Sequence, residues 1–463
     1  MRVAFTEDRM AMGKRKKHQQ PPLFVAAVNL PQSPAHPFYQ KLNRILAENG
    51  FDPFVEGLCQ KFYHQTMGRP SLQPGQFFRL MLIGYFEGID TERGIAWRCA
   101  DSFSLRSFVG YGIDEAVADH STISRTRRLM DVETLHEVFA WILKVLAKYD
   151  LISGKTAGVD ATTLEANAAM RSIIRRDTKE SYEEFLTRLA QASGIETPTR
   201  EDLAKIDRNR KNKASNDDWE HPHDPDAKIA KMKDGSTHLA HKVEHAVDME
   251  TGAVLGVTLQ GADQGDTTTL MNTVIEATQN LRELSDDPQT QEKIHEDWMS
   301  EVVADKGYHS NGTVGDLREM EICSYISEPD RGRRHWEGNA GCQAAVYANR
   351  RRIRGERGKR LMRKRGELIE RSFAHGYETG GMRRLHLRHR ENIYKRLLVH
   401  MGGFNLSLVM RQVMGMGKPR RWQGLFLSIF AIISALWSVL ATIWRELRRP
   451  EREIQLTSRL TAG

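Results

Sequence analysis

Three acidic residues that lie far apart in the chain have the chemistry for a shared metal site. Asp160 ends the apolar run 156–160, Asp305 ends the run 301–305, and Glu370 lies in a helical pattern that follows a run of arginines. Carboxylate oxygens are the ligands that Mg²⁺ prefers. A pair of such ions activates an attacking oxygen and stabilises a leaving oxygen in phosphodiester chemistry. We therefore predict that Asp160, Asp305 and Glu370 form a catalytic site that binds two Mg²⁺ or Mn²⁺ ions.

Other acids compete for this role. Asp248 ends the strand pattern 242–248, and Asp263 and Asp266 follow the next strand pattern. Aspartate also starts turns and caps helices. We expect Asp248 to begin a turn and Asp266 to cap a helix that begins near residue 267.

The charge of the chain indicates a polyanionic partner. The net charge is +8, and ten Lys or Arg residues lie between Arg350 and Arg365, with Glu356 as the one acid. The alternative is a solvated helix face, since charge runs are often merely exposed. Because the run directly precedes Glu370, we predict contact with nucleic acid, and Arg365 and Arg371 would neutralise phosphate near the metals. The residues predicted to bind DNA here are Arg350, Arg351, Arg352, Arg365 and Arg371.

The cysteines indicate a reducing compartment. The four cysteines have no CxxC spacing, which argues against a zinc site and against a disulfide framework. The first twenty residues are polar and basic, without the apolar stretch of a secretory signal. We expect a cytoplasmic protein.

One apolar segment, 424–444, contains no charged residue and has basic residues on both sides. Its length meets the minimum for a membrane-spanning helix. The alternative is a buried or self-associating helix, which we favour because nothing else in the chain indicates a membrane. We assign 416–463 to this basic-flanked helix and tail.

The region 1–150 is predicted to be helical. Helices are expected at 74–86, 91–99 and 102–108, followed by a turn and a polar helix that Asp119 or Ser121 caps. Short helices around a turn are typical of a helix-turn-helix unit that binds DNA. The alternative is three-helix packing without DNA contact. The predicted DNA-binding residues of this unit are Ser124, Arg125, Arg127 and Arg128.

The region 151–415 alternates strand and helix patterns, which predicts an α/β fold with a mixed sheet. The strand patterns at 242–248 and 254–260 are separated by a short connection and read as a hairpin. A charged insertion at about 171–235 is expected to contain a helix near 182–192 and otherwise to be loop. Its His221, His223 and Asp224 are interpreted as a proline-interrupted surface loop rather than a metal site.

Three segments in order resemble a DDE transposase of a bacterial insertion sequence. They are Gly158–Thr163, Ala304–Tyr308 and Glu370–Ala374, and the resemblance runs from about residue 36 to 411. The relatives carry an Arg four residues before the glutamate and a Lys seven after it. This chain has Gly366, with Arg365 adjacent, and Tyr377 at those places, so Glu367 is the alternative third acid.

The resemblance implies a catalytic core of the RNase H-like type and metal-dependent cleavage of DNA. The freed 3′-hydroxyl would attack target DNA, and the enzyme would act as a homo-oligomer on the nucleoid. Two alternatives stay open: a DNA-binding protein with an inactive nuclease-like domain, and a metal-dependent nuclease that cuts but does not join.

Overall fold

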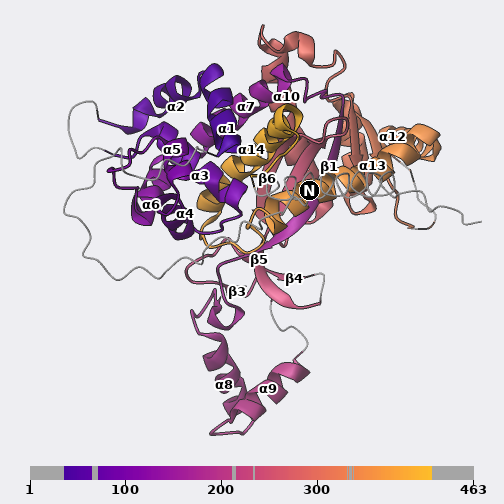
Figure 1. The fold of residues 1–463 in the computed structure, drawn as a ribbon. Coiled ribbons are helices and arrows are strands. Elements are labelled where there is room, and N and C mark those ends of the chain that lie inside the picture. Colours follow the sequence, from indigo (N-terminus) through magenta and orange to yellow (C-terminus); the bar gives the residue numbers. More distant parts are fainter. Residues whose placement is uncertain are drawn as a thin grey trace, which may run out of the picture.

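The computed structural model describes residues 36–419 except 65–70, 211–214, 233–234, 331, 333–335 and 337. These residues form a body with one protruding arm (Figure 1). The apolar segment 424–444 lies outside the described residues. Among the helices that are described, none is long and apolar enough to cross a membrane.

The first part of the chain is helical, as predicted. Its α-helices are α1 (Pro37–Glu48), α2 (Phe51–Cys59), α3 (Pro74–Glu87), α4 (Glu92–Ala100), α5 (Phe103–Val109), α6 (His120–Leu129) and α7 (Val132–Lys148). The side chains of Thr91, Ser102, Asp119 and Asp131 each accept a backbone N–H in the first turn of a helix. These caps fix where α4 to α7 begin. The predicted helices and the cap at Asp119 are confirmed.

A six-stranded sheet, counted over the described residues, follows. Its strands are β1 (Thr156–Glu165), β4 (Lys228–Lys231), β5 (Thr237–Asp248), β6 (Val254–Gly261), β7 (Glu301–Ala304) and β8 (Cys323–Ile326). The strand order is β4-β5-β1-β7-β8, with β6 also paired to β5. Strand β5 runs antiparallel to β1, β4 and β6, whereas β1, β7 and β8 are parallel. The predicted α/β class with a mixed sheet is confirmed, and so is the β5–β6 hairpin.

Two helices cover opposite faces of the sheet, α10 (Asp266–Asp286) and α13 (Glu356–Phe373). Consecutive residues of a strand point to opposite faces. Glu244 of β5 accepts hydrogen bonds from threonines of α10, whereas the next residue, His245, bonds to Ser372 of α13. Each helix therefore meets alternate side chains of the same strand.

Helix α14 (Arg390–Met414) joins the helical region to the sheet. It packs on α3, α7 and β6. Asn405 of α14 binds both the N–H and the C=O of Val254 in β6, at 2.9 and 2.8 Å. At Gly403, an added Cβ would lie 2.9 Å from the Tyr85 ring of α3, so only glycine allows this approach. One hydrophobic core contains residues of the N-terminal helices, the sheet and α14, and residue 150 does not separate two cores.

The predicted charged insertion forms the arm that extends away from the body (Figure 1). The predicted helix, α8 (Tyr182–Ala192), is confirmed, but the remainder is not loop alone. A second helix follows it, and two short strands pair at the base of the arm. These elements are β2 (Ile174–Arg175), α9 (Arg200–Asn209) and β3 (Trp219–Glu220). Phe185, Leu186 and Trp219 give the arm a small core of its own.

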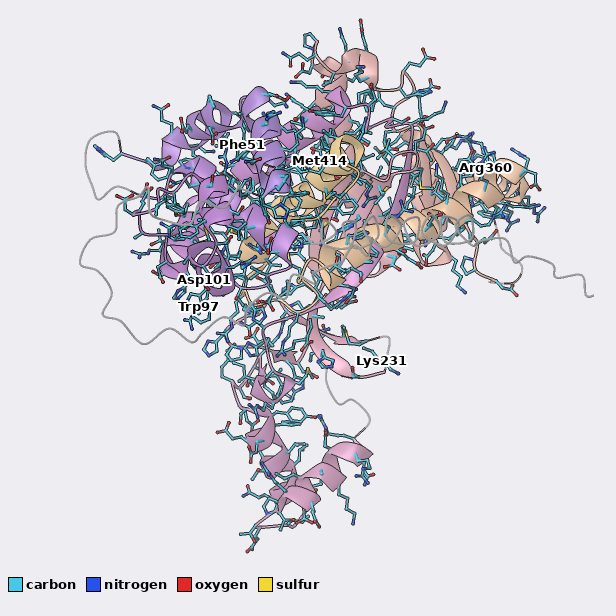
Figure 2. All side chains as sticks on the ribbon, viewed as in Figure 1. Phe51, Trp97, Asp101, Lys231, Arg360 and Met414 are labelled. Carbon is cyan, nitrogen blue, oxygen red and sulfur yellow. The ribbon has the colours of Figure 1, made fainter. Side chains whose placement is uncertain are left out.

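The remaining elements are two helices and five short helical turns. They are α11 (Asn311–Glu319), α12 (Ala340–Arg354), η2 (Gln60–Phe62), η3 (Met170–Ser172), η4 (Gln291–Lys293), η5 (Lys306–Tyr308) and η6 (Ala374–Glu378). The arginine-rich run 350–365 covers the end of α12 and the first half of α13. Its Arg360 lies at the end of the body opposite Phe51 (Figure 2).

Candidate active site

Asp160 and Asp305 lie on neighbouring parallel strands. In the β1–β7 register, Gly158 is opposite Val303. Two residues further along, Asp160 faces the position of Asp305, which directly follows β7. The Asp305 carboxylate accepts the Gly307 N–H at 2.8 Å and so caps η5. The structure therefore brings these two carboxylates to one edge of the sheet.

Asp160 ends the apolar run 156–160 but does not end a strand, because β1 continues to Glu165 in pairing with β5. Asp160 lies opposite His245 and shares its face of the sheet, the face covered by α13. Arg365 of α13 donates to Asp160 Oδ2 at 3.1 Å, and the Ala161 N–H donates to Oδ1 at 2.8 Å. The second Nη atom of Arg365 is buried and has no hydrogen-bond partner among the described residues.

The electrostatics around Asp160 are those of a carboxylate cluster. Burial raises the pKa of Asp160, and the nearby carboxylates of Asp305 and Asp266 raise it further, against the opposing effect of Arg365. Like charges that share a site disfavour the ionised form unless a cation joins them. The cluster therefore carries negative charge that Arg365 does not fully offset.

Asp266 is a third member of the cluster, and the sequence prediction for it was wrong. The residue that caps α10 is Gly265, and the Asp266 side chain instead pairs with Lys242 at 2.6 Å. An added Cβ on Gly307 would lie 2.7 Å from an Asp266 oxygen and 3.0 Å from an Asp305 oxygen. The carboxylates of Asp266 and Asp305 therefore border the same point beside Gly307.

Buried side chains around Glu244 lie next to this cluster and hold it in place. Glu244 has no exposed surface; it accepts hydrogen bonds from Thr269, Thr273 and Tyr308 and pairs with Lys242 at 3.0 Å. Burial and the surrounding carboxylates raise the pKa of Tyr308, which therefore stays a protonated donor. Its full set of partners identifies Glu244 as a support for the cluster rather than a member of it.

The third predicted acid lies apart from these contacts. Glu370 is exposed on α13, one residue after Ile369, which packs beside Gly158. Its carboxylate makes no hydrogen bond or ion pair with a described residue. The alternative, Glu367, is also exposed and pairs with Arg371 at 2.6 Å.

The arginines predicted in the helix-turn-helix unit divide into two kinds. Arg125 and Arg128 are exposed on α6, and their hydrogen bonds to described residues all stay within α6. Arg127 is 4% exposed; it pairs with Glu92 at 2.7 Å and donates to Asn392 of α14 and to Ser124. Its guanidinium holds α6 against α4 and α14, so Arg127 is not available to a DNA phosphate in this structure.

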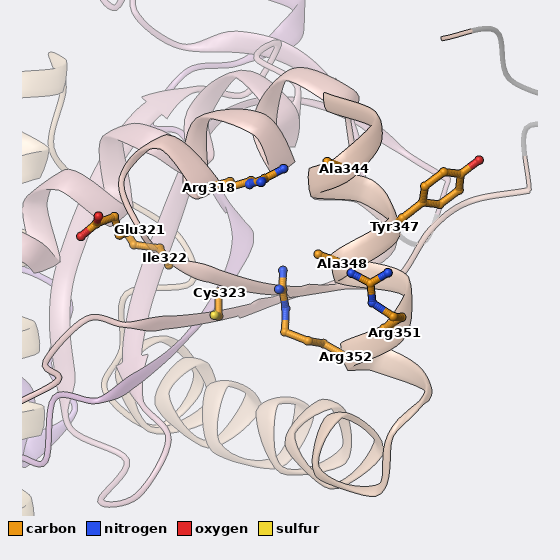
Figure 3. Close-up of a pocket in the computed structure, with 9 residues that line it drawn as sticks. All are labelled: Arg318, Glu321, Ile322, Cys323, Ala344, Tyr347, Ala348, Arg351 and Arg352. Atoms are coloured by element: carbon orange, nitrogen blue, oxygen red, sulfur yellow. The ribbon is translucent and has the colours of Figure 1, made fainter. Parts of the chain in front are cut away.

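The arginines of α12 divide in the same way. Arg350 binds Glu328 with two hydrogen bonds at 2.5 and 2.7 Å. Arg352 donates to Ser324 of β8, whereas Arg351 is exposed and makes no ion pair with a described residue. Arg318, Arg351 and Arg352 line a pocket of about 360 Å³ between α11, α12 and β8 (Figure 3). This pocket is an exposed basic hollow in the part of the chain that the structure describes.

Comparison with known families gives two matches. Residues 29–129 match the Transposase domain (DUF772) family, and residues 216–406 match the Transposase DDE domain family. The second match contains Asp266, Asp305 and Glu370, and Asp160 lies between the two matches. No curated protein and no solved structure gives a significant match.

Proposed function

Because this chain belongs to the DDE transposases of insertion elements, we propose that it cuts DNA at the ends of its element. It would then join the freed 3′ ends to target DNA. The observation that carries the proposal is that the parallel register of β1 and β7 brings Asp160 near Asp305, whose carboxylate contributes to the raised pKa of Asp160 after burial. Aspartates on adjacent central strands, with a long helix packed over one of them, also support an RNase H-like core.

The carboxylate cluster fits divalent cations. Asp160, Asp305 and Asp266 supply only hard oxygen donors. Burial and then the neighbouring carboxylates of Asp305 and Asp266 raise the pKa of Asp160, and a bound cation would favour its ionised form. We propose that Asp160 and Asp305 hold Mg²⁺ or Mn²⁺, two ions in all, with the third carboxylate from Glu370 or Asp266. Such ions, when bound, activate an attacking oxygen and stabilise a leaving one.

The chain's own cations would position the DNA. Arg365 already holds Asp160 with one Nη atom, and its unpartnered second Nη atom is a donor for a phosphate oxygen at the site. Lys242 holds Asp266 and Glu244 in place. Arg365 would therefore orient the scissile phosphate, and Lys242 would fix the carboxylates around it.

DNA would extend over two exposed basic surfaces. One is the pocket lined by Arg351 and Arg352, and the other is the α6 face that carries Arg125 and Arg128. Exposed arginines bind phosphates without reading sequence. We propose that α6 and its neighbours form the helix-turn-helix unit, that two copies of the chain hold two element ends, and that the enzyme works on the nucleoid.

The test uses full-length protein and labelled DNA that carries the inverted repeats flanking its gene. With Mg²⁺ we expect nicked and joined products, and Asp160→Asn and Asp305→Asn should yield neither while still binding DNA. Cleavage without any joining would favour a nuclease. Binding without cleavage in any divalent metal would favour an inactive DNA-binding protein and overturn the proposal.

A matched set of variants identifies which residue supplies the third carboxylate. If Glu370 is the ligand, Glu370→Gln abolishes cleavage and Asp266→Asn only weakens it; the reverse pattern assigns Asp266. Glu367→Gln is the control, because Glu367 lies on the same helix and is engaged by Arg371. Loss of activity in the control alone would assign the role to Glu367.

A further inference from the structure

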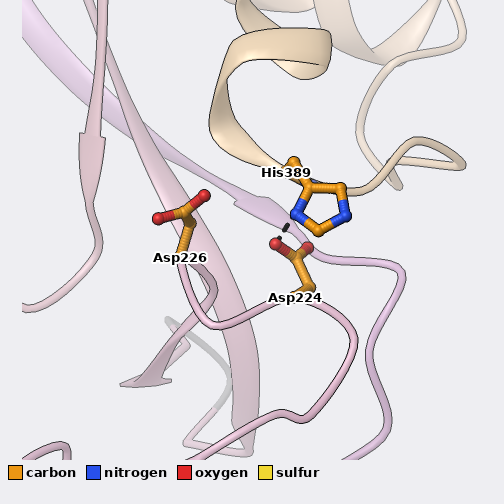
Figure 4. A group of neighbouring side chains, drawn as sticks. All are labelled: Asp224, Asp226 and His389. Atoms are coloured by element: carbon orange, nitrogen blue, oxygen red, sulfur yellow. Dashed lines mark hydrogen bonds between the residues drawn. The ribbon is translucent and has the colours of Figure 1, made fainter.

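A second group of metal-ligating side chains lies where the arm meets the N-terminus of α14. The ligand atoms of Asp224, Asp226 and His389 all lie within 4.8 Å of one another (Figure 4). Asp224 Oδ1 accepts the His389 N–H at 3.1 Å, and Asp226 Oδ2 accepts the Arg390 N–H at 3.1 Å. Each aspartate thus caps α14 with one oxygen and keeps the other for a further partner.

A buried histidine, His241 of β5, lies beside Asp224 of this group. It is fully buried, and neither of its ring nitrogens has a hydrogen-bond partner among the described residues. Its Nε2 lies 3.6 Å from Asp224 Oδ2, which is also buried and unpartnered. A buried polar group without a hydrogen-bond partner destabilises the folded state. Two such groups that face each other indicate a ligand between them.

We propose that Asp224, Asp226, His241 and His389 bind a divalent transition-metal ion of the zinc type. The donors are two carboxylate oxygens and two imidazole nitrogens, the mixed set that suits Zn²⁺ and contrasts with the all-oxygen set that Mg²⁺ prefers. Four protein ligands leave no open position, which is typical of structural rather than catalytic zinc. The sequence interpretation of residues 221–224 as a plain surface loop does not account for this arrangement.

The site would fasten three distant segments together. Asp224 and Asp226 lie between β3 and β4 at the base of the arm, His241 belongs to β5, and His389 precedes α14. A metal clip that closes long loops restricts the unfolded chain. The ion would therefore fix the base of the arm to the body, on a part of the sheet separate from the carboxylate cluster.

The simplest competing account is a protonated His241 paired with Asp224. Such a pair would satisfy one nitrogen of His241 and leave its Nδ1 without a hydrogen-bond partner among the described residues. The two accounts differ in a measurable way, because the ion pair requires no metal.

The experiment measures zinc bound to full-length protein after chelator treatment and equilibrium dialysis against ZnCl₂. We expect one equivalent that persists in the Asp305→Asn variant, which separates it from metal at the carboxylate cluster. His389→Ala changes an exposed side chain, and Asp224→Asn retains the capping oxygen, so both variants should fold. Each should lower zinc affinity by at least about tenfold.

The control is His223→Ala, an exposed histidine of the same loop outside the group. It should bind zinc like the wild type. Co²⁺ provides a second readout, since a four-coordinate site gives a strong visible absorption that His389→Ala would remove. Wild-type protein that binds no zinc, or that binds it equally well with His389→Ala and Asp224→Asn, would overturn the proposal.

Discussion

Two histidines, His241 and His245, lie four residues apart on one face of β5 and are equally buried, yet their surroundings differ completely. His245 is bonded at both ring nitrogens, to Ser372 and to Tyr377. Because the Ser372 hydroxyl donates to the Ile369 carbonyl, it accepts from His245 Nδ1, and the Tyr377 hydroxyl donates to Nε2. His241 has no such partner at either nitrogen among the described residues.

The difference separates a structural side chain from a ligand. A buried polar group whose bonds are complete has no further partner to find, and it locks its neighbours in place. A buried polar group with open positions is costly unless something binds there. His245 therefore ties α13 to the sheet beside Asp160, whereas His241 indicates a site that an ion fills.

The largest expected effect is on DNA cleavage. It distinguishes Asp160, which lies opposite His245, from Asp224, which lies beside His241. Asp160→Asn should lower the rate of DNA cleavage by roughly 10³-fold, because the variant lacks a carboxylate that would hold the metal ions. Each factor of ten in rate corresponds to about 1.4 kcal/mol of lost transition-state stabilisation. Asp224→Asn should leave the cleavage rate per folded molecule within about threefold of the wild type. Gel assays of labelled ends would measure both cleavage rates. An equal loss of cleavage in Asp224→Asn would show that the two sites do not act separately.

The next effect is on stability. Free zinc at 100 times its Kd should stabilise the wild-type fold by about 2.7 kcal/mol relative to chelated protein. At the same zinc concentration His389→Ala should gain at most about 1.4 kcal/mol, because the loss of a ligand weakens its zinc affinity by at least about tenfold. Thermal unfolding followed by circular dichroism would measure the shift, and an equal response in His389→Ala would contradict the comparison.

A smaller effect concerns acid. Burial lowers the pKa of His245 from the usual 6.5 to about 3. Between these values the unfolded chain binds the extra proton, so this histidine's contribution to stability is full above pH 6.5 and is lost as the pH falls, by up to about 1.4 kcal/mol per unit.

His245→Asn should therefore be less stable than wild type at pH 7 but lose stability less steeply between pH 6.5 and 4. Urea unfolding at several pH values would measure both slopes. His223→Asn is the control, an exposed histidine that should leave the slope unchanged. A variant slope as steep as that of the wild type would assign the acid sensitivity to other groups.

The smallest expected effect is on DNA binding. It compares two adjacent arginines of α12, one that is exposed and one that is engaged by a carboxylate. Arg351 is exposed without an ion pair among the described residues, whereas Arg350 is engaged by Glu328. Arg351→Gln should weaken DNA binding severalfold and reduce the slope of log affinity against log salt by about 1. Arg350→Gln should change that slope less, and equal slopes in both variants would show that the ion pair opens on DNA.

The sequence predicted the class of fold, because alternating strand and helix patterns indicate an α/β sheet. It also predicted that Asp160 and Asp305 lie near each other, but it did not predict that β1 continues beyond Asp160 to Glu165. It did not identify Asp266, since an aspartate before a helix resembles a cap until its partner Lys242 is located. Arg127 resembled a phosphate ligand because Asn392, which engages it, lies 265 residues away in the chain. The group around His241 was missed for the same reason, since its members come from three separate segments.

The position of α14 has a consequence for shortened products of the gene. Its side chains fill the core beneath α3 and α7 as well as the sheet. A premature stop or a proteolytic nick ahead of residue 390 would thus leave the amino-terminal helices with an open apolar face. Such fragments should aggregate or be degraded by the cell. They would not persist and compete with the full-length protein for DNA.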